Sequence, residues 1–204
     1  VKEVLADLET PLSLYVKLTQ AFGQKNTYLL ESVLGGERFG RFSFIGLPAK
    51  TVLRTVGTPD APLTEVLFND KVIETNRDNP LDFVDAYFKR FKVAVQPGLP
   101  RFCGGLAGYF GYDTVRYIES RLAKHDLPDE LGVPDIQLML TEELAVIDNV
   151  AGRIYLIVYA DPSITDGFEK GQARLKELLA CLSKPVSMPA SLPSTKTALV
   201  RKFK

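Results

Sequence analysis

The stretch Tyr28–Gly46, YLLESVLGGERFGRFSFIG, raises the question on which the interpretation of this sequence depends. It begins as an apolar run typical of a β-strand, and then Glu31 and Ser32 occupy positions where that run would continue. Burying a charge without a partner is costly in a protein core. Either the strand ends at this point, or the carboxylate and the hydroxyl meet a partner.

Glu31 and Ser32 have two interpretations. In the first, the strand breaks at Gly35-Gly36 and the polar pair begins the turn. In the second, the pair belongs to a polar patch that binds a small zwitterion, with the Glu31 carboxylate accepting from an ammonium group. The Ser32 hydroxyl and Arg38 or Arg41 would then bind the remaining groups. The residues alone leave both interpretations open.

Patterns of apolar residues predict helices and strands along the rest of the chain. The first helix begins at Pro11, because Thr10 is a favourable N-cap and proline is favoured at the first helical position. Helices are also expected from Pro80 onward, over 113–118 and over 167–182. Strands are expected over 27–34, 41–45, 51–56, 65–68, 72–75, 136–140, 144–147 and 154–159. Many strands in hairpins with few flanking helices predict an α+β fold, in which helices wrap antiparallel sheets.

Two local patterns add detail to this prediction. Asn69-Asp70 separates two of the strands and is typical of a tight hairpin. In the helix that starts at Pro80, apolar residues recur at a helical spacing and should share one buried face. These residues are Leu81, Val84, Phe88 and Phe91.

The last part of the chain has a different composition. Residues 183–204 contain Pro185, Pro189 and Pro193 among serine, threonine and alanine, which is the composition of a linker. We therefore expect one folded domain over 1–182, followed by a linker that leads toward a further domain.

Charge and hydropathy exclude several classes of protein. Lysine plus arginine number 25 and aspartate plus glutamate also number 25, so the chain lacks the basic excess of a nucleic-acid-binding protein. No apolar run approaches the ~20 residues of a membrane-spanning helix, and the first residues are charged rather than typical of a signal peptide. We expect a cytoplasmic protein without nucleic-acid or membrane partners.

The search for catalytic or metal-binding residues finds no active site. Gly105, Gly108 and Gly111 are spaced by three, which matches neither a dinucleotide-binding fingerprint nor a P-loop, and small residues there favour close strand packing. The single histidine, His125, lies among charged and loop-forming residues. Cys103 and Cys181 are far apart in the sequence and are typical of small core residues, so we expect no metal site and no cofactor in this chain.

Three sequence blocks resemble the N-terminal region of anthranilate synthase component I. They are LLES followed by GGERFGRFSFIG within 29–46, GGLAGYFGYDTVRYIE at 104–119, and PDIQLMLTEELAVIDN at 134–149. Their order and spacing match the family, and the match extends from about residue 1 to the helix that ends near Leu182. The GYFGYD segment is also similar to aminodeoxychorismate synthase component I, a sister enzyme.

The resemblance implies a fold and an activity for a longer parent protein. Members of the family have two intertwined lobes of antiparallel sheet wrapped by helices, and this region supplies much of one lobe. The full enzyme, a lyase, converts chorismate to anthranilate with ammonia from a glutamine amidotransferase subunit, and it binds Mg²⁺ at the chorismate site. This region carries much of the site for allosteric feedback inhibition by L-tryptophan.

Residues of the tryptophan site follow from the same resemblance. Leu30, Glu31 and Ser32 match its LLES signature, and Arg41 is the nearest match to a basic residue that follows. The Thr-Arg-Pro, Asp-Leu-x-Arg-Asn-Asp and Pro-Tyr-Met motifs of the chorismate-binding half do not occur here. We therefore expect residues 1–182 to be a regulatory domain without catalytic residues, joined through 183–204 to a C-terminal catalytic domain. The alternatives are the same region of aminodeoxychorismate synthase, or a free-standing small-molecule-binding domain.

Overall fold

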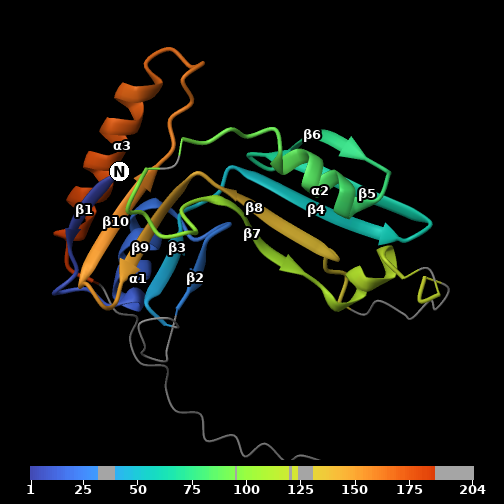
Figure 1. Cartoon of the computed structure of the whole chain (residues 1–204), viewed down its shortest axis with the longest axis horizontal. Coiled ribbons are helices and arrows are strands. Elements are labelled where there is room, and N and C mark those ends of the chain that lie inside the picture. Colours follow the sequence, from blue (N-terminus) through green and yellow to red (C-terminus); the bar gives the residue numbers. More distant parts are fainter. Residues whose placement is uncertain (32–39, 95, 120, 124–130, 187–204) are drawn as a thin grey trace, which may run out of the picture.

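The chain forms two five-stranded antiparallel sheets with helices packed against them (Figure 1). The computed structural model describes residues 1–31, 40–94, 96–119, 121–123 and 131–186. Sheet A contains, in spatial order, β1 (Lys2–Leu5), β10 (Arg153–Val158), β9 (Glu143–Asp148), β3 (Phe42–Gly46) and β2 (Tyr28–Leu30). Sheet B contains β6 (Lys71–Asn76), β5 (Ala61–Phe68), β4 (Thr51–Thr58), β8 (Ile136–Thr141) and β7 (Gly105–Phe110). The helices are α1 (Pro11–Phe22), α2 (Pro80–Phe88), α3 (Gly167–Leu182) and a 3₁₀ helix, η1 (Tyr112–Tyr117).

Sheet A is packed on both faces. Helices α1 and α3 cover one face, where Leu14, Leu18 and Leu178 are almost completely buried together with Leu156 of β10. On the other face, Leu144, Val146 and Ile157 pack against aromatic residues and against the segment that contains Leu99, Phe102 and Cys103. Both the predicted start of α1 at its Thr10 cap and the predicted extent of α3 are confirmed.

Sheet B carries α2 on one face, but the buried side of that helix differs from the prediction. Phe83 and Tyr87 pack on Leu53, Val66, Ile136 and Leu138, with Leu81 and Val84 at the margin. By contrast, Phe88 and Phe91 are 51% and 41% exposed. The helix ends at Phe88, so Phe91 of the predicted apolar face lies beyond it. Phe83 and Tyr87, one helical turn apart, form the contact with sheet B instead.

The strand predictions are otherwise confirmed. Asn69 and Asp70 join β5 to β6 with φ angles of 48° and 65°, which is the conformation of a type I′ hairpin turn. Strands β1 and β7 were not predicted. The four residues of β1 form an edge strand without apolar alternation, and β7 lies in a glycine-rich stretch that lacks a clear strand pattern. Residues 27–34 form a strand only over β2 as far as the structure describes them.

The two sheets share continuous stretches of chain at their junction. Strand β8 of sheet B leads into β9 of sheet A with only Glu142 between them. Strand β3 leads into β4 through a short segment, in which the Leu47 amide donates to the Glu143 carbonyl at 3.0 Å. These two crossings fix the sheets against each other.

The glycines of β7 serve strand packing, as predicted. A Cβ at Gly108 would lie 2.0 Å from the Gln137 carbonyl oxygen and 2.9 Å from the Leu138 Cα. Only glycine allows β7 and β8 to approach this closely. Cys103 and Cys181 are buried free thiols, also as predicted. No helix in the described residues has the length and hydropathy needed to cross a membrane.

Candidate functional site

The predicted binding residues lie at an edge of sheet A. In the described part of the chain, β2 pairs only with β3, with Tyr28 opposite Gly46, Leu29 opposite Ile45 and Leu30 opposite Phe44. Leu29 packs into the core beneath α1 and α3. Because side chains alternate along a strand, Leu30 lies on the opposite face, and it is 52% exposed. Glu31 follows at once and is exposed, whereas Ser32 lies outside the described residues.

An aromatic surface adjoins Leu30. Directly opposed residues in antiparallel strands point to the same face, so Leu30 and Phe44 are neighbours. Phe44 contacts Phe102 edge to face, with ring centroids 5.3 Å apart, and Phe42 lies 6.3 Å from Phe44. An exposed leucine beside a partly buried aromatic cluster, with a carboxylate at its end, is suited to a ligand that has an apolar ring and an ammonium group.

Arg41 has a structural partner in this arrangement. Its guanidinium stacks over Phe42, 4.9 Å from the ring centroid, and its Nε and Nη2 donate to the Asp148 carboxylate at 3.1 and 2.7 Å. Asp148 is buried and also accepts from the backbone amides of Val150 and Ala151. Arg41 therefore anchors the β9–β10 turn beside the start of β3.

The Asp148 pair makes stability depend on pH in the acid range. Hydrogen bonds from Arg41 lower the pKa of the Asp148 carboxyl, burial opposes them, and the two backbone amides add to the lowering. A lowered folded-state pKa stabilises the protein above the unfolded pKa of about 3.9, and this contribution is lost as the pH falls through the folded value. We expect Asp148→Asn to cost about 2 kcal/mol at pH 7 and progressively less below about pH 4. Urea titrations at several pH values test this, and a pH-independent difference would contradict it.

Tyr28 connects this sheet edge to the junction of the sheets. Its hydroxyl lies 3.1 Å from the Thr141 Oγ1 at the end of β8, and burial raises the pKa of the Tyr28 phenol. The ring lies on Gly46, where a Cβ would be 2.1 Å from the ring carbon Cε1. Sequence reasoning did not single out Tyr28 or Gly46, because their contact depends on the register between β2 and β3.

A second candidate is a cleft of about 850 Å³ at the junction of the sheets. Its charged lining includes Lys50, Glu142 and Arg174. The Arg174 guanidinium forms an ion pair with Glu143 at 2.9 Å and stacks over the Phe22 ring. Burial raises the pKa of the Glu142 carboxyl, and the charge of Lys50 opposes that shift. No sequence signal joined these residues, which come from separate strands and helices.

Neither region resembles a metal centre in the part of the chain that the structure describes. Within those residues, no three histidine, cysteine, aspartate or glutamate side chains are grouped so that they could hold a metal ion. The fold and the site thus define a class: an α+β protein of two antiparallel sheets with a candidate small-molecule site at a sheet edge.

Comparisons with known proteins identify the relatives of this chain. The chain is 50% identical over 206 residues to anthranilate synthase component 1 of Neisseria meningitidis serogroup C, covering all of this chain and 40% of that protein. It is 52% identical over 188 residues to anthranilate synthase component 1 of Pseudomonas aeruginosa, covering 91% of this chain and 36% of the relative. The crystal structure of anthranilate synthase component I from Streptococcus pneumoniae matches with a TM-score of 0.54 and 24% identity, over 91% of this chain and 37% of that one. No family model matches.

The chain belongs to the anthranilate synthase component 1 family. It spans about 40% of the length of the Neisseria relative. The Streptococcus structure supports the two-sheet α+β fold.

Proposed function

We propose that this chain is the regulatory region of an anthranilate synthase component I and binds L-tryptophan at the end of β2. The observation that carries the proposal is the exposure of Leu30 opposite Phe44 of the aromatic cluster formed by Phe42, Phe44 and Phe102, with Glu31 exposed directly after the strand. The aromatic and leucine side chains suit an indole ring, and the Glu31 carboxylate suits an ammonium group. Ser32 completes the polar part of the site, and Arg41 supports it through the β9–β10 turn.

The activity of the parent enzyme is part of the same proposal. It forms anthranilate from chorismate, with ammonia from a glutamine amidotransferase subunit, and Mg²⁺ binds at the chorismate site. That chemistry belongs to the part of the relatives that this chain does not span, so the chain alone is catalytically inactive. Residues 1–182 form the regulatory domain in this proposal, and 183–204 form the linker to the catalytic domain of a cytoplasmic enzyme.

The alternative functions have less support. Aminodeoxychorismate synthase component I shares the GYFGYD pattern, but the relatives at about 50% identity are named anthranilate synthase component 1. The linker-like composition of residues 183–204 favours a regulatory region over a free-standing binding domain.

Inhibition requires that tryptophan bind one state of the enzyme better than another. The Tyr28–Thr141 hydrogen bond offers a route for this, because it ties the strand that carries Glu31 to the junction of the two sheets. A ligand that draws the end of β2 toward itself therefore acts next to a hydrogen bond that joins sheet A to sheet B.

Ser32→Phe is expected to relieve inhibition without impairing catalysis. The test uses a hybrid protein, in which this chain replaces the matched segment of the full-length Neisseria meningitidis relative. The bulky ring fills the proposed site, so the tryptophan concentration for half-inhibition should rise by more than about tenfold, while kcat/KM for chorismate changes little. Ser183→Phe, at the exposed end of α3, is the matched control. Unchanged inhibition in the Ser32→Phe hybrid would refute the assignment.

A further inference from the structure

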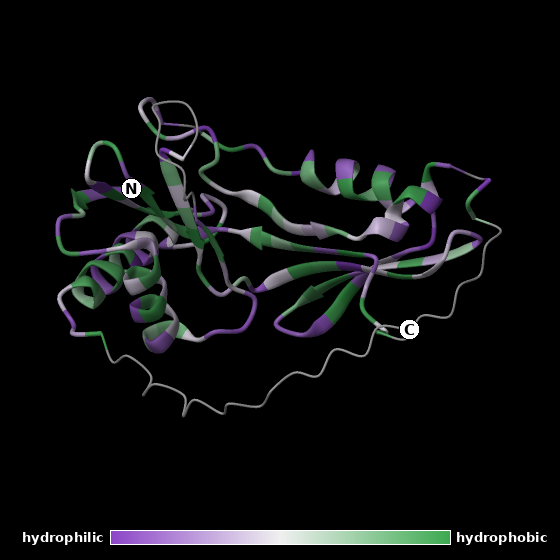
Figure 2. Ribbon diagram, turned by 90° about the horizontal axis from the view of Figure 1, so that it is seen from below, coloured by the Kyte–Doolittle hydropathy of each residue, from purple (hydrophilic) through white to green (hydrophobic). Residues whose placement is uncertain are grey.

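The cleft at the junction of the sheets is built from both halves of the fold. In Figure 2, α2 lies over sheet B, and the helices that cover sheet A lie apart from it. The residues that line the cleft come from the end of α1, from the first two-thirds of α3, from the β5–β6 turn and from both crossings between the sheets. Its volume of about 850 Å³ lies in the range of small-molecule sites.

Contacts within the protein hold the walls of this cleft in place. On one side, the Arg174 guanidinium stacks 4.1 Å from the centroid of the Phe22 ring and pairs with Glu143 at 2.9 Å. On the other side, the Ala49 amide donates to the Asn26 carbonyl at 3.0 Å, and the Asn26 Nδ2 donates to the Ala49 carbonyl at 3.3 Å. The cleft is therefore formed before any ligand binds.

Most charged groups of the cleft have partners within the protein. The paired groups are Lys25 with Asp70, Arg174 with Glu143 and Glu177, Lys170 with the Thr165 carbonyl, and Asp161 with Ser163. Within the described part of the chain, the side chains of Lys50 and Glu142 form neither an ion pair nor a hydrogen bond. The cleft thus presents one cation and one carboxylate that a ligand can use.

Lys50 and Glu142 influence each other across the cleft. Both residues are exposed and both line it, one on each crossing between the sheets. Enough protein surrounds the Glu142 carboxyl to raise its pKa by burial, and the charge of Lys50 opposes that shift. A perturbed carboxyl with a nearby cation in a cleft is typical of a functional site.

The pattern of charge and hydropathy indicates the class of ligand. A polyanion such as a nucleotide would meet the carboxylates of Glu142 and Asp161, so the cleft disfavours it. A zwitterion can place its carboxylate on Lys50 and its ammonium group on Glu142. Leu47, Val158 and Ile164 supply aliphatic contact in the same cleft, and Ile164 is 52% exposed.

We propose that this cleft binds a free aliphatic α-amino acid between Lys50 and Glu142. The site is separate from the proposed tryptophan site. Phe22 and Val158 pack on the face of sheet A that carries α1 and α3, whereas Leu30 lies on the opposite face. The proposal does not depend on tryptophan binding at the end of β2.

Nuclear magnetic resonance titration with L-leucine tests this proposal. L-Leucine should give saturable shifts at the amides of Ala49, Ala160 and Gly171, which line the cleft. 4-Methylpentanoate lacks the ammonium group and 3-methylbutylamine lacks the carboxylate, so each should bind at least tenfold more weakly. This comparison uses only the parent chain and is independent of how any variant folds.

Substitutions of the two charged groups locate the site. Lys50→Met and Glu142→Gln should each weaken L-leucine binding by more than about tenfold. Lys176→Met and Glu169→Gln, at exposed positions of α3 outside the cleft, are the matched controls and should bind as the parent does. Glu31→Gln should also bind L-leucine normally, so failure of this site and failure of the tryptophan site are distinguishable.

Several results would overturn the proposal. These are no saturable shift with L-leucine, equal binding of the acid or the amine, unchanged affinity in Lys50→Met and Glu142→Gln, or shifts confined to the end of β2. The same titration on the hybrid with the Neisseria relative should retain L-leucine binding. Loss of binding in the hybrid would also overturn the proposal, because the rest of the polypeptide would then cover the cleft.

Discussion

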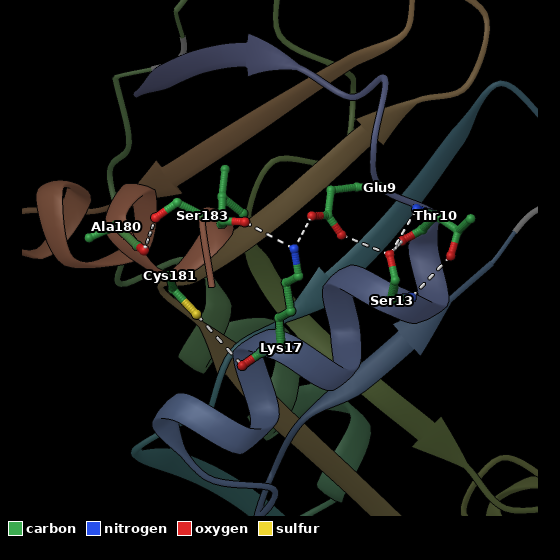
Figure 3. Close-up of polar contacts among 8 residues, drawn as sticks. Glu9, Thr10, Ser13, Lys17, Ala180, Cys181 and Ser183 are labelled. Atoms are coloured by element: carbon green, nitrogen blue, oxygen red, sulfur yellow. Dashed lines mark hydrogen bonds and ion pairs between the residues drawn. The ribbon is translucent and has the colours of Figure 1, made fainter. Parts of the chain in front are cut away.

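Lys17→Met should lower the free energy of unfolding by about 3–5 kcal/mol, the cost of breaking a buried ion pair. Lys17 and Glu9 form an ion pair with side chains only 11% and 8% exposed, and the Lys17 Nζ also donates to the Leu182 carbonyl at 2.9 Å (Figure 3). The substitution leaves the Glu9 carboxylate buried with a single side-chain donor, the Ser13 hydroxyl at 2.7 Å. It also removes the donor that satisfies the last turn of α3.

A double-mutant cycle separates the charge from the packing. Glu9→Gln in the Lys17→Met background removes the stranded charge, so the double variant should recover part of the lost stability. Chemical unfolding monitored by circular dichroism gives all four free energies. Additive losses, or a Lys17→Met variant as stable as the parent, would contradict a coupled buried ion pair between Lys17 and Glu9.

Gly108→Val should cost about 3 kcal/mol or more, at the upper end of overpacking effects. The added Cβ meets the backbone of β8 at Gln137 and Leu138, which cannot move without breaking the β7–β8 ladder. A loss of stability with the secondary-structure content retained at low temperature supports a packing role for this glycine. The urea midpoint of the variant measures the loss.

Gly171→Ala is the matched control for that experiment. Gly171 lies inside α3, and its added Cβ would meet only the Ala160 Cβ, at an ordinary 3.4 Å. Alanine has the higher helix propensity, so the variant should be more stable by up to about 1 kcal/mol. Equal effects at Gly108 and Gly171 would mean that loss of glycine flexibility, rather than close strand packing, explains the first result.

The sequence predicts the fold well where local signals are strong. The Thr10 cap, the Asn69-Asp70 turn and the apolar periodicity of α3 each depend on neighbouring residues, and all appear in the structure. The buried face of α2 could not be predicted from the local sequence, because two sets of apolar residues fit the helical period. Only the contact with sheet B decides which set is buried. The edge strand β1 lacks alternation, since its pairing with β10 is made through the backbone.

The candidate site was predictable only in part. Glu31 stands out because a carboxylate interrupts an apolar run, yet the residues alone did not separate a turn from a binding site. The resemblance to a family made that choice, and the structure shows Leu30 and Glu31 exposed at the end of β2. The sequence alone could not identify Asp148 as the partner of Arg41, because the two residues lie 107 positions apart. Only the register between β3 and β9 brings Arg41 and Asp148 together.

The position of β2 links this site to the rest of the molecule. Its pairing with β3 and the packing of Tyr28 on Gly46 hold β2 in place, and Glu31 follows this strand directly. Within this short edge strand, Tyr28 contacts Thr141 at the sheet junction, and Leu29 packs on the core beneath α1 and α3. The tryptophan site that we propose at this edge therefore lies next to a contact between the two sheets.

Calorimetric titration with L-tryptophan tests the central claim most directly. The experiment compares L-tryptophan with D-tryptophan and L-phenylalanine, and the parent chain with Glu31→Gln, which keeps the shape of the side chain but removes its charge. We expect saturable binding that is selective for L-tryptophan and more than about tenfold weaker in Glu31→Gln. A chain that unfolds cooperatively by circular dichroism, yet binds none of the ligands or binds all three equally, would contradict a tryptophan site built around the end of β2.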